Sequence, residues 1–255
     1  MAAIGLFNDI AVFITIGHIF TLPMIGLWYG FKRKWQTSYI DRAVYLAFFV
    51  GSFSDSFILI GGQTGEILQI CTTIIMHTIV IAIFRKEGTR IYSDKLKDLP
   101  KLLIPISIIF IFFGAVMIPI LPDVIYFIAI FYAVQEMILV SHGFFREVKG
   151  KSYVWVATGV SLLMVKDGLY CYIFFMNHMA NRPLYIIEYT LSTTVYFMIA
   201  VGIAINQQNT EKIKSETLLE YLRNYLKKSS KVRYAKHSHK YLFNRREDSQ
   251  QTQLN

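Results

Sequence analysis

The stretch Gly159-Val-Ser-Leu-Leu-Met-Val-Lys-Asp-Gly-Leu-Tyr-Cys171 decides the fold class, because it places Lys166 and Asp167 side by side within a long apolar run. The flanking residues from Tyr153 to Met176 are almost all apolar, aromatic or small, which predicts a membrane-spanning helix. A charge inside such a helix costs roughly 2.5 to 3.5 kcal/mol on insertion, so these residues usually face a bundle interior and mark a functional site. Asp55 lies equally deep in another apolar run, and we expect both aspartates to face one pocket.

The composition of the chain agrees with a protein embedded in a membrane. Its 255 residues are 54% hydrophobic and only 17% charged, whereas soluble domains usually carry about 25% charged residues. The net charge of +9 is concentrated in loops and in the C-terminal tail, which indicates membrane topology rather than nucleic acid binding. Cys71 and Cys171 both lie in apolar runs, and no ligand set has convincing metal spacing, so we expect no disulfide, metal or cofactor.

The apolar runs predict an all-α, multi-pass protein, with a bundle of about seven transmembrane helices in residues 1–206 and a basic tail in residues 207–255. The predicted spans run from Ile10 to Tyr29, Ala43 to Ile60, Ile67 to Phe84, Leu102 to Leu121, Val124 to Phe144, Tyr153 to Met176 and Leu184 to Ile205. Lysine and arginine gather in the loops after the first, third and fifth spans and in the tail, whereas the opposite side has only Arg182. The positive-inside rule then predicts an N-terminus outside and a cytoplasmic C-terminus, in a bacterial inner membrane or another cellular membrane.

The tail contains an amphipathic stretch between Glu211 and Lys228. Its apolar residues lie on one helical stripe and are Ile213, Leu218, Leu219, Leu222, Tyr225 and Leu226. This pattern is typical of a short helix that lies on an anionic cytoplasmic leaflet, but a solvated tail that only sets the topology would give it too. From Asn244 onward the sequence predicts disorder.

Several polar side chains lie near the middle of the predicted spans. They are Asp55, His77, Tyr132, Glu136, Lys166 and Asp167. A carboxyl group at that depth needs a partner or a proton, and Lys166 is a candidate partner. A purely structural buried ion pair is the simpler interpretation of the same residues.

Three other polar residues have simpler interpretations still. His18 is expected to be a hydrogen-bonded interior histidine, and His142 to be solvated near the cytoplasmic interface. Glu188 lies near the outer end of the last span, where we expect it to be wetted or paired with Arg182.

Four short motifs between Ala43 and Ile205 carry a resemblance to a known family. They are Ser54-Asp-Ser-Phe-Ile-Leu59, the apolar stretch Ile74-Ile-Met-His-Thr78, the stretch Tyr132-Ala-Val-Gln-Glu-Met137, and the spacing of eight residues from Gly159 to Asp167. With them, the segment resembles the YhhN family of membrane proteins, whose animal members are lysoplasmalogenases. The family usually has serine where Lys166 stands, and its members commonly have eight helices.

This resemblance implies a hydrolase that cleaves the vinyl ether bond of a lysophospholipid substrate, a lysoplasmalogen, to a fatty aldehyde and a glycerophospho-alcohol. Asp55 and Asp167 are then the candidate catalytic residues, one protonating the outer alkene carbon and the other stabilising the resulting cation. The pocket or supporting residues are His77, Tyr132, Glu136 and Lys166. The alternative is a non-enzymatic seven-helix transporter, sensor or receptor, in which the buried acids serve a proton or ligand pathway.

Overall fold

The computed structural model describes residues 11–57, 60, 62–91, 98–119, 121, 123–175 and 182–251, and within these ranges the regular elements are helices. The α-helices are α2 (Ala11–Lys32), α3 (Tyr39–Ser56), α4 (Gly62–Lys86), α5 (Leu99–Phe112), α6 (Asp123–Phe144), α7 (Lys151–Phe175) and α8 (Arg182–Gln251). The predicted all-α class is therefore confirmed, with seven α-helices in the described part of the chain.

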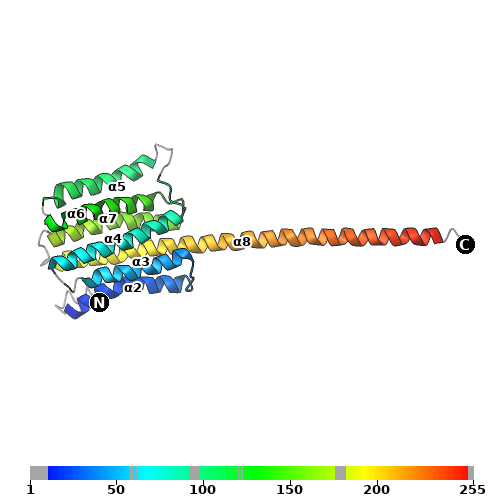
Figure 1. Cartoon of the computed structure of the whole chain (residues 1–255), viewed down its shortest axis with the longest axis horizontal. Coiled ribbons are helices and arrows are strands. Elements are labelled where there is room, and N and C mark those ends of the chain that lie inside the picture. Colours follow the sequence, from blue (N-terminus) through cyan, green and yellow to red (C-terminus); the bar gives the residue numbers. More distant parts are fainter. Residues whose placement is uncertain are drawn as a thin grey trace. The chain divides into compact units, whose positions relative to one another are not determined.

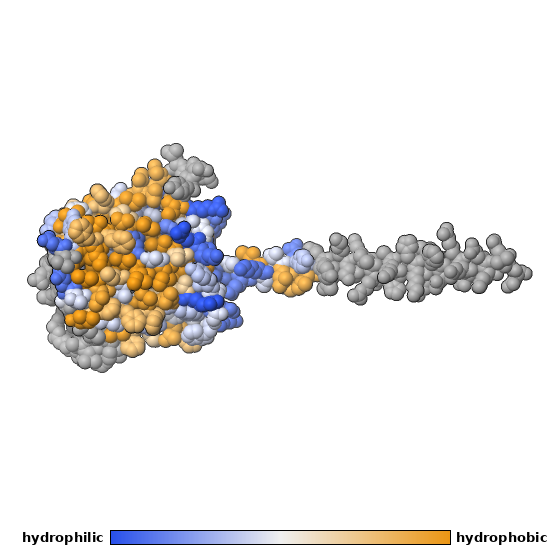
Figure 2. Space-filling model, viewed as in Figure 1, coloured by the Kyte–Doolittle hydropathy of each residue, from blue (hydrophilic) through white to orange (hydrophobic). Residues whose placement is uncertain are grey.

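Five of these helices are long and apolar enough to cross a membrane. The crossing segments are Gly62–Lys86, Leu99–Met117, Ile125–Phe144, Lys151–Ile173 and Ile186–Arg223. Figure 2 shows hydrophobic residues over most of the visible face of the helix bundle, as expected where lipid rather than water covers it. The protein is a multi-pass integral membrane protein.

The helices of the bundle lie side by side, with α5 at one edge and α2 at the other (Figure 1). Helix α3 packs against α2 and α4, and α6 packs against α4, α5 and α7. Helix α5 packs mainly on α6 and continues into a π-helical turn, η3 (Phe113–Met117). Such turns often occur at functional sites, and Phe113 and Met117 both line the cavity described below.

Glycines let neighbouring helices approach closely at two points. A Cβ atom on Gly51 of α3 would lie 2.5 Å from both Leu22 of α2 and Met76 of α4. A Cβ atom on Gly202 of α8 would collide with Val156 and lie 2.9 Å from the carbonyl oxygen of Ser152 in α7. Small residues at such contacts are how membrane helices gain close van der Waals packing.

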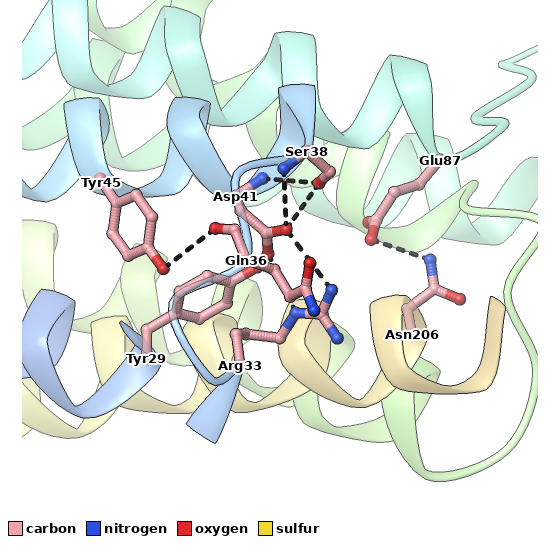
Figure 3. A network of polar contacts seen from close by, with 8 residues as sticks. All are labelled: Tyr29, Arg33, Gln36, Ser38, Asp41, Tyr45, Glu87 and Asn206. Carbon is pink, nitrogen blue, oxygen red and sulfur yellow. Dashed lines mark hydrogen bonds and ion pairs between the residues drawn. The ribbon is translucent and has the colours of Figure 1, made fainter. Parts of the chain in front are cut away.

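A buried polar network closes the connection between α2 and α3 (Figure 3). The Asp41 carboxylate accepts hydrogen bonds from Arg33 Nε at 2.9 Å, from the Tyr29 hydroxyl at 2.8 Å and from Ser38 Oγ at 2.7 Å. Ser38 caps the N-terminus of α3, since its hydroxyl accepts the Asp41 backbone N–H. Burial acts to raise the pKa of Asp41, but the hydrogen bonds from Arg33, Ser38 and Tyr29 more than offset this, and the pKa lies below its usual value.

A second buried ion pair joins the end of α4 to the connection between α6 and α7. Arg146 donates to Glu87 from Nη2 at 2.7 Å and from Nε at 3.0 Å, and both side chains are fully shielded from solvent. Asn206 of α8 donates a further hydrogen bond to Glu87 at 2.8 Å, as Figure 3 shows. The connections after α2, α4 and α6, which carry the basic residues, are thus stabilised by two buried ion pairs, Arg33–Asp41 and Arg146–Glu87.

The chain divides into two compact units, Met1–Asn206 and Gln207–Asn255, and α8 contributes to both. In the second unit the apolar side chains Ile213, Leu218, Leu219 and Leu222 are exposed. Tyr225 and Leu226, the other members of the predicted stripe, lie outside the side chains that the structure describes. The sequence predicts disorder from Asn244, whereas α8 continues to Gln251.

Candidate functional site

A cavity of about 590 Å³ lies among α4, α5, α6 and α7. Its walls are largely apolar side chains, among them Ile70, Ile108, Phe112, Met117, Ala133 and Met164. Its polar lining residues include Tyr132, Glu136, Lys166 and Asp167, which we call the acid cluster. The volume falls within the roughly 300 to 1,000 Å³ that small-molecule sites usually have.

Asp167 is the centre of the acid cluster. One of its carboxylate oxygens, Oδ2, accepts the Tyr132 hydroxyl at 2.8 Å, and the other, Oδ1, accepts Lys166 Nζ at 2.8 Å. Although Lys166 is the preceding residue on α7, its long side chain turns back to the carboxylate. The predicted pairing of the buried carboxylate with Lys166 is therefore present.

Glu136 lies next to Asp167 and interacts with its carboxylate. Glu136 is only 6% exposed, and its Oε1 atom has no hydrogen-bond partner among the described residues. A buried acceptor without a donor costs about 1 to 3 kcal/mol, so this oxygen is positioned for a ligand or a proton.

His77 contacts the acid cluster through Tyr132 but is not among the residues that line the cavity. Its ring lies 5.6 Å from the ring of Tyr132, and its Nε2 atom lies 3.5 Å from the Tyr196 hydroxyl. The other ring nitrogen, Nδ1, is buried without a hydrogen-bond partner in the part of the chain that is described. His77 therefore packs on Tyr132, which in turn binds Asp167.

Asp55 lines a second, smaller pocket of about 50 Å³. The other lining residues are Thr21, Leu22, Gln69, Lys166, Tyr170, Glu188, Tyr189, Ser192 and Thr193. Asp167 is absent from this lining, so the structure replaces the single pocket expected for both aspartates by two pockets. Lys166 and Tyr170 of α7 and Gln69 of α4 line both of them.

Two residues outside the sequence-based candidates hold Lys166 between the pockets. Its ammonium group lies 5.7 Å from the centre of the Tyr170 ring and 6.0 Å from that of Tyr196. The Tyr170 hydroxyl donates to Gln69 Oε1 at 3.1 Å, which fixes the ring beside α4. The spacing of Tyr170 from Lys166, one helical turn along α7, was the available signal for this cation–π contact.

The structure corrects the sequence-based interpretation of one acid, Glu188, and one base, His142. Glu188 is only 5% exposed and lines the small pocket, rather than being wetted at the surface. His142 is 7% exposed, and its Nδ1 atom lies 2.8 Å from the carbonyl oxygen of Ile138, so it is not solvated at the interface. The side chains of His18 and Arg182 lie outside those that the structure describes.

Within the described ranges, no group of three or more His, Cys, Asp or Glu side chains is arranged to hold a metal ion. The sequence matches no family model, and neither a curated protein nor a solved structure matches this chain. The fold and the site thus define the chain by class alone, as a multi-pass membrane protein with an intramembrane cavity that ends on buried carboxyl groups.

Proposed function

We propose that this protein is a membrane-embedded hydrolase that cleaves the vinyl ether bond of a lysoplasmalogen, as its resemblance to the YhhN family implies. The observation that carries the proposal is the apolar cavity of about 590 Å³ with Glu136 and Asp167 in its lining. A single aliphatic chain would occupy the space between the apolar walls, and the vinyl ether would lie against the acid cluster. A lysolipid has one such chain, whereas a diacyl lipid has two.

The geometry favours Glu136 and Asp167 as the reacting pair, in place of the sequence-based pair Asp55 and Asp167. Both oxygens of Asp167 accept donors, from Lys166 and Tyr132, and such hydrogen bonds stabilise an ionised carboxylate. Glu136 Oε1 lacks a donor among the described residues, as suits a neutral carboxylic acid. We therefore assign Glu136 as the general acid and Asp167 as the ionised partner.

The reaction then follows from these two roles. Glu136 transfers its proton to the outer alkene carbon, which leaves an oxocarbenium ion that the Asp167 carboxylate stabilises. Water adds to the cation and gives up a proton to Asp167, and the resulting hemiacetal separates into an aldehyde and an alcohol. Because the two carboxyl groups interact, the proton returns from Asp167 to Glu136, and the net reaction consumes one water molecule.

Helix α5 supplies a route for a lipid substrate. Ile104 and Ile108 of α5 line the cavity and are 58% and 52% exposed. Because α5 packs mainly on α6, at the edge of the bundle (Figure 1), we expect the bilayer to lie against the outer side of α5. A lysolipid that lies in the membrane would enter past α5 without crossing water.

The proposed topology has seven spans, with α2 and α3 added to the five long apolar helices, an N-terminus outside and a cytoplasmic tail. It is supported by the basic residues in the connections after α2, α4 and α6. The exposed apolar stripe of the tail would lie on the anionic leaflet of the same side.

The test is turnover of mixed lysolipids by the purified full chain, followed by mass spectrometry for the fatty aldehyde. Asp167→Asn and Glu136→Gln should each reduce turnover by about 10²- to 10⁴-fold, the usual contribution of general acid–base catalysis. Glu147→Gln is the control, since Glu147 belongs to an exposed ion pair with Arg90 and is not in the cavity lining, so turnover should stay near the wild-type rate.

Two results would count against this assignment. Folded Asp167→Asn and Glu136→Gln proteins with wild-type turnover would exclude the proposed pair. A loss of turnover in Asp55→Asn but not in Glu136→Gln would restore the pair expected from the sequence.

A receptor or sensor is the second candidate, and α8 is the observation that favours it. This helix is continuous from Arg182 to Gln251 and so includes both the last membrane span and the tail. The cavity lining includes no described residue of α8, but Lys166 of that lining lies 6.0 Å from the ring centre of Tyr196 in α8, so a ligand that displaced Lys166 would also act on α8. Saturable lysolipid binding without any aldehyde product would favour this candidate over the hydrolase.

A further inference from the structure

The small pocket beside the acid cluster is lined by two carboxyl groups, those of Asp55 and Glu188, and the Lys166 ammonium interacts electrostatically with both. Glu188 is only 5% exposed, and its carboxyl group belongs to the pocket lining. Lys166, the basic residue of the pocket lining, already forms an ion pair with Asp167 at 2.8 Å. Buried charges are normally paired with a counter-charge or coordinate a metal ion, and one ammonium group cannot neutralise the carboxylates of Asp55, Glu188 and Asp167 together.

The other polar lining groups are neutral oxygen ligands. Thr21 Oγ1 donates its proton to the carbonyl oxygen of Gly17 at 2.6 Å and also forms a hydrogen bond with the Tyr189 hydroxyl. Thr193 Oγ1 donates to the carbonyl oxygen of Tyr189 at 3.1 Å. A hydroxyl that donates its proton to the backbone and accepts one hydrogen bond at most keeps a lone pair available for a cation. The hydroxyl of Ser192 and the side chain of Gln69 complete an oxygen-rich lining, which suits a hard cation.

We propose that this pocket binds a monovalent cation of the size of Na⁺, held by Asp55 and Glu188. A volume of about 50 Å³ has room for one small cation with one or two waters, given that a water needs roughly 10 to 15 Å³ measured in this way. The Lys166 ammonium in the same lining opposes a divalent ion more strongly than a monovalent one, since repulsion scales with charge.

The cation would join the three consecutive helices α2, α3 and α4 to α8, which lies far away in the sequence. Its ligands come from α2 through Thr21, from α3 through Asp55, from α4 through Gln69 and from α8 through Glu188. Because Lys166 lines both pockets, occupation of the small one would also change the charge that faces the acid cluster. The proposal does not depend on the hydrolase activity, since it concerns binding at a separate pocket.

The experiment measures the melting temperature of the purified full chain in detergent, at constant ionic strength, in NaCl, KCl or choline chloride. We expect a saturable rise in melting temperature with Na⁺ that choline does not produce. Asp55→Asn and Glu188→Gln should each abolish the Na⁺-dependent rise. Glu147→Gln, a change in an exposed surface ion pair, should keep it.

The wild-type protein alone keeps the proposal testable if the variants do not fold. Broadening of the ²³Na resonance by the protein, reversed by excess Li⁺ but not by choline, would support a bound cation. Equal melting in Na⁺ and choline would overturn the proposal, as would a Na⁺ effect that persists in both variants. A melting temperature that rises only as the pH falls, with no effect of Na⁺, would show that protons occupy the pocket instead.

Discussion

Removal of Arg146 should destabilise the bundle strongly, because it leaves Glu87 buried without its cation. In Arg146→Met, Glu87 loses hydrogen bonds of 2.7 and 3.0 Å and keeps that from Asn206 at 2.8 Å. The substitution also removes the cation–π contact in which Arg146 Cζ lies 5.3 Å from the centre of the Phe84 ring. Breaking a fully buried ion pair by removing one partner typically costs about 3 to 5 kcal/mol, and we expect a loss of that size in the free energy of unfolding.

The measurement is denaturant-induced unfolding of the purified variants in mixed micelles. Arg146→Met combined with Glu87→Gln should cost less than Arg146→Met alone, because no uncompensated charge then remains. The matched control is Arg90→Met, which breaks the exposed pair with Glu147 at 3.0 Å and should cost at most about 1 kcal/mol. If Arg146→Met costs no more than Arg90→Met, the Arg146–Glu87 pair is not the buried contact that the reasoning requires.

Two further predictions concern the ends of the bundle. Because the pKa of Asp41 is lowered in the folded protein, its stabilising effect is present above its usual pKa near 4 and is lost as the pH falls through the folded value. Asp41→Asn should therefore melt below the wild type at pH 7, with a difference that shrinks toward pH 3; a difference independent of pH would contradict this. A reporter fused after Asn255 should be active only in its cytoplasmic form, and activity of an exclusively extracytoplasmic reporter there would refute the proposed orientation.

The acid cluster shows how far polar residues in apolar runs can be interpreted from the sequence. Lys166, Asp167 and Glu136 stand out because a charge in a membrane helix is costly, and each is found in the interior lining of one cavity. The same reasoning could not show that Asp55 lines a different pocket, or that Glu188 joins it there. The depth of a residue in the membrane can be counted along the helix, but the sequence does not show which neighbouring helix the residue faces.

The helical class and the membrane location follow from the apolar segments alone, because a chain in lipid must satisfy its backbone hydrogen bonds within each such segment. Which residues share a pocket, in contrast, depends on how the helices pack against one another. In a membrane helix the lipid-facing and protein-facing sides are both apolar, so their periodicity does not identify the neighbours. Those neighbours depend on close contacts such as Gly202 with Val156 and Gly51 with Leu22, which join residues distant in the chain.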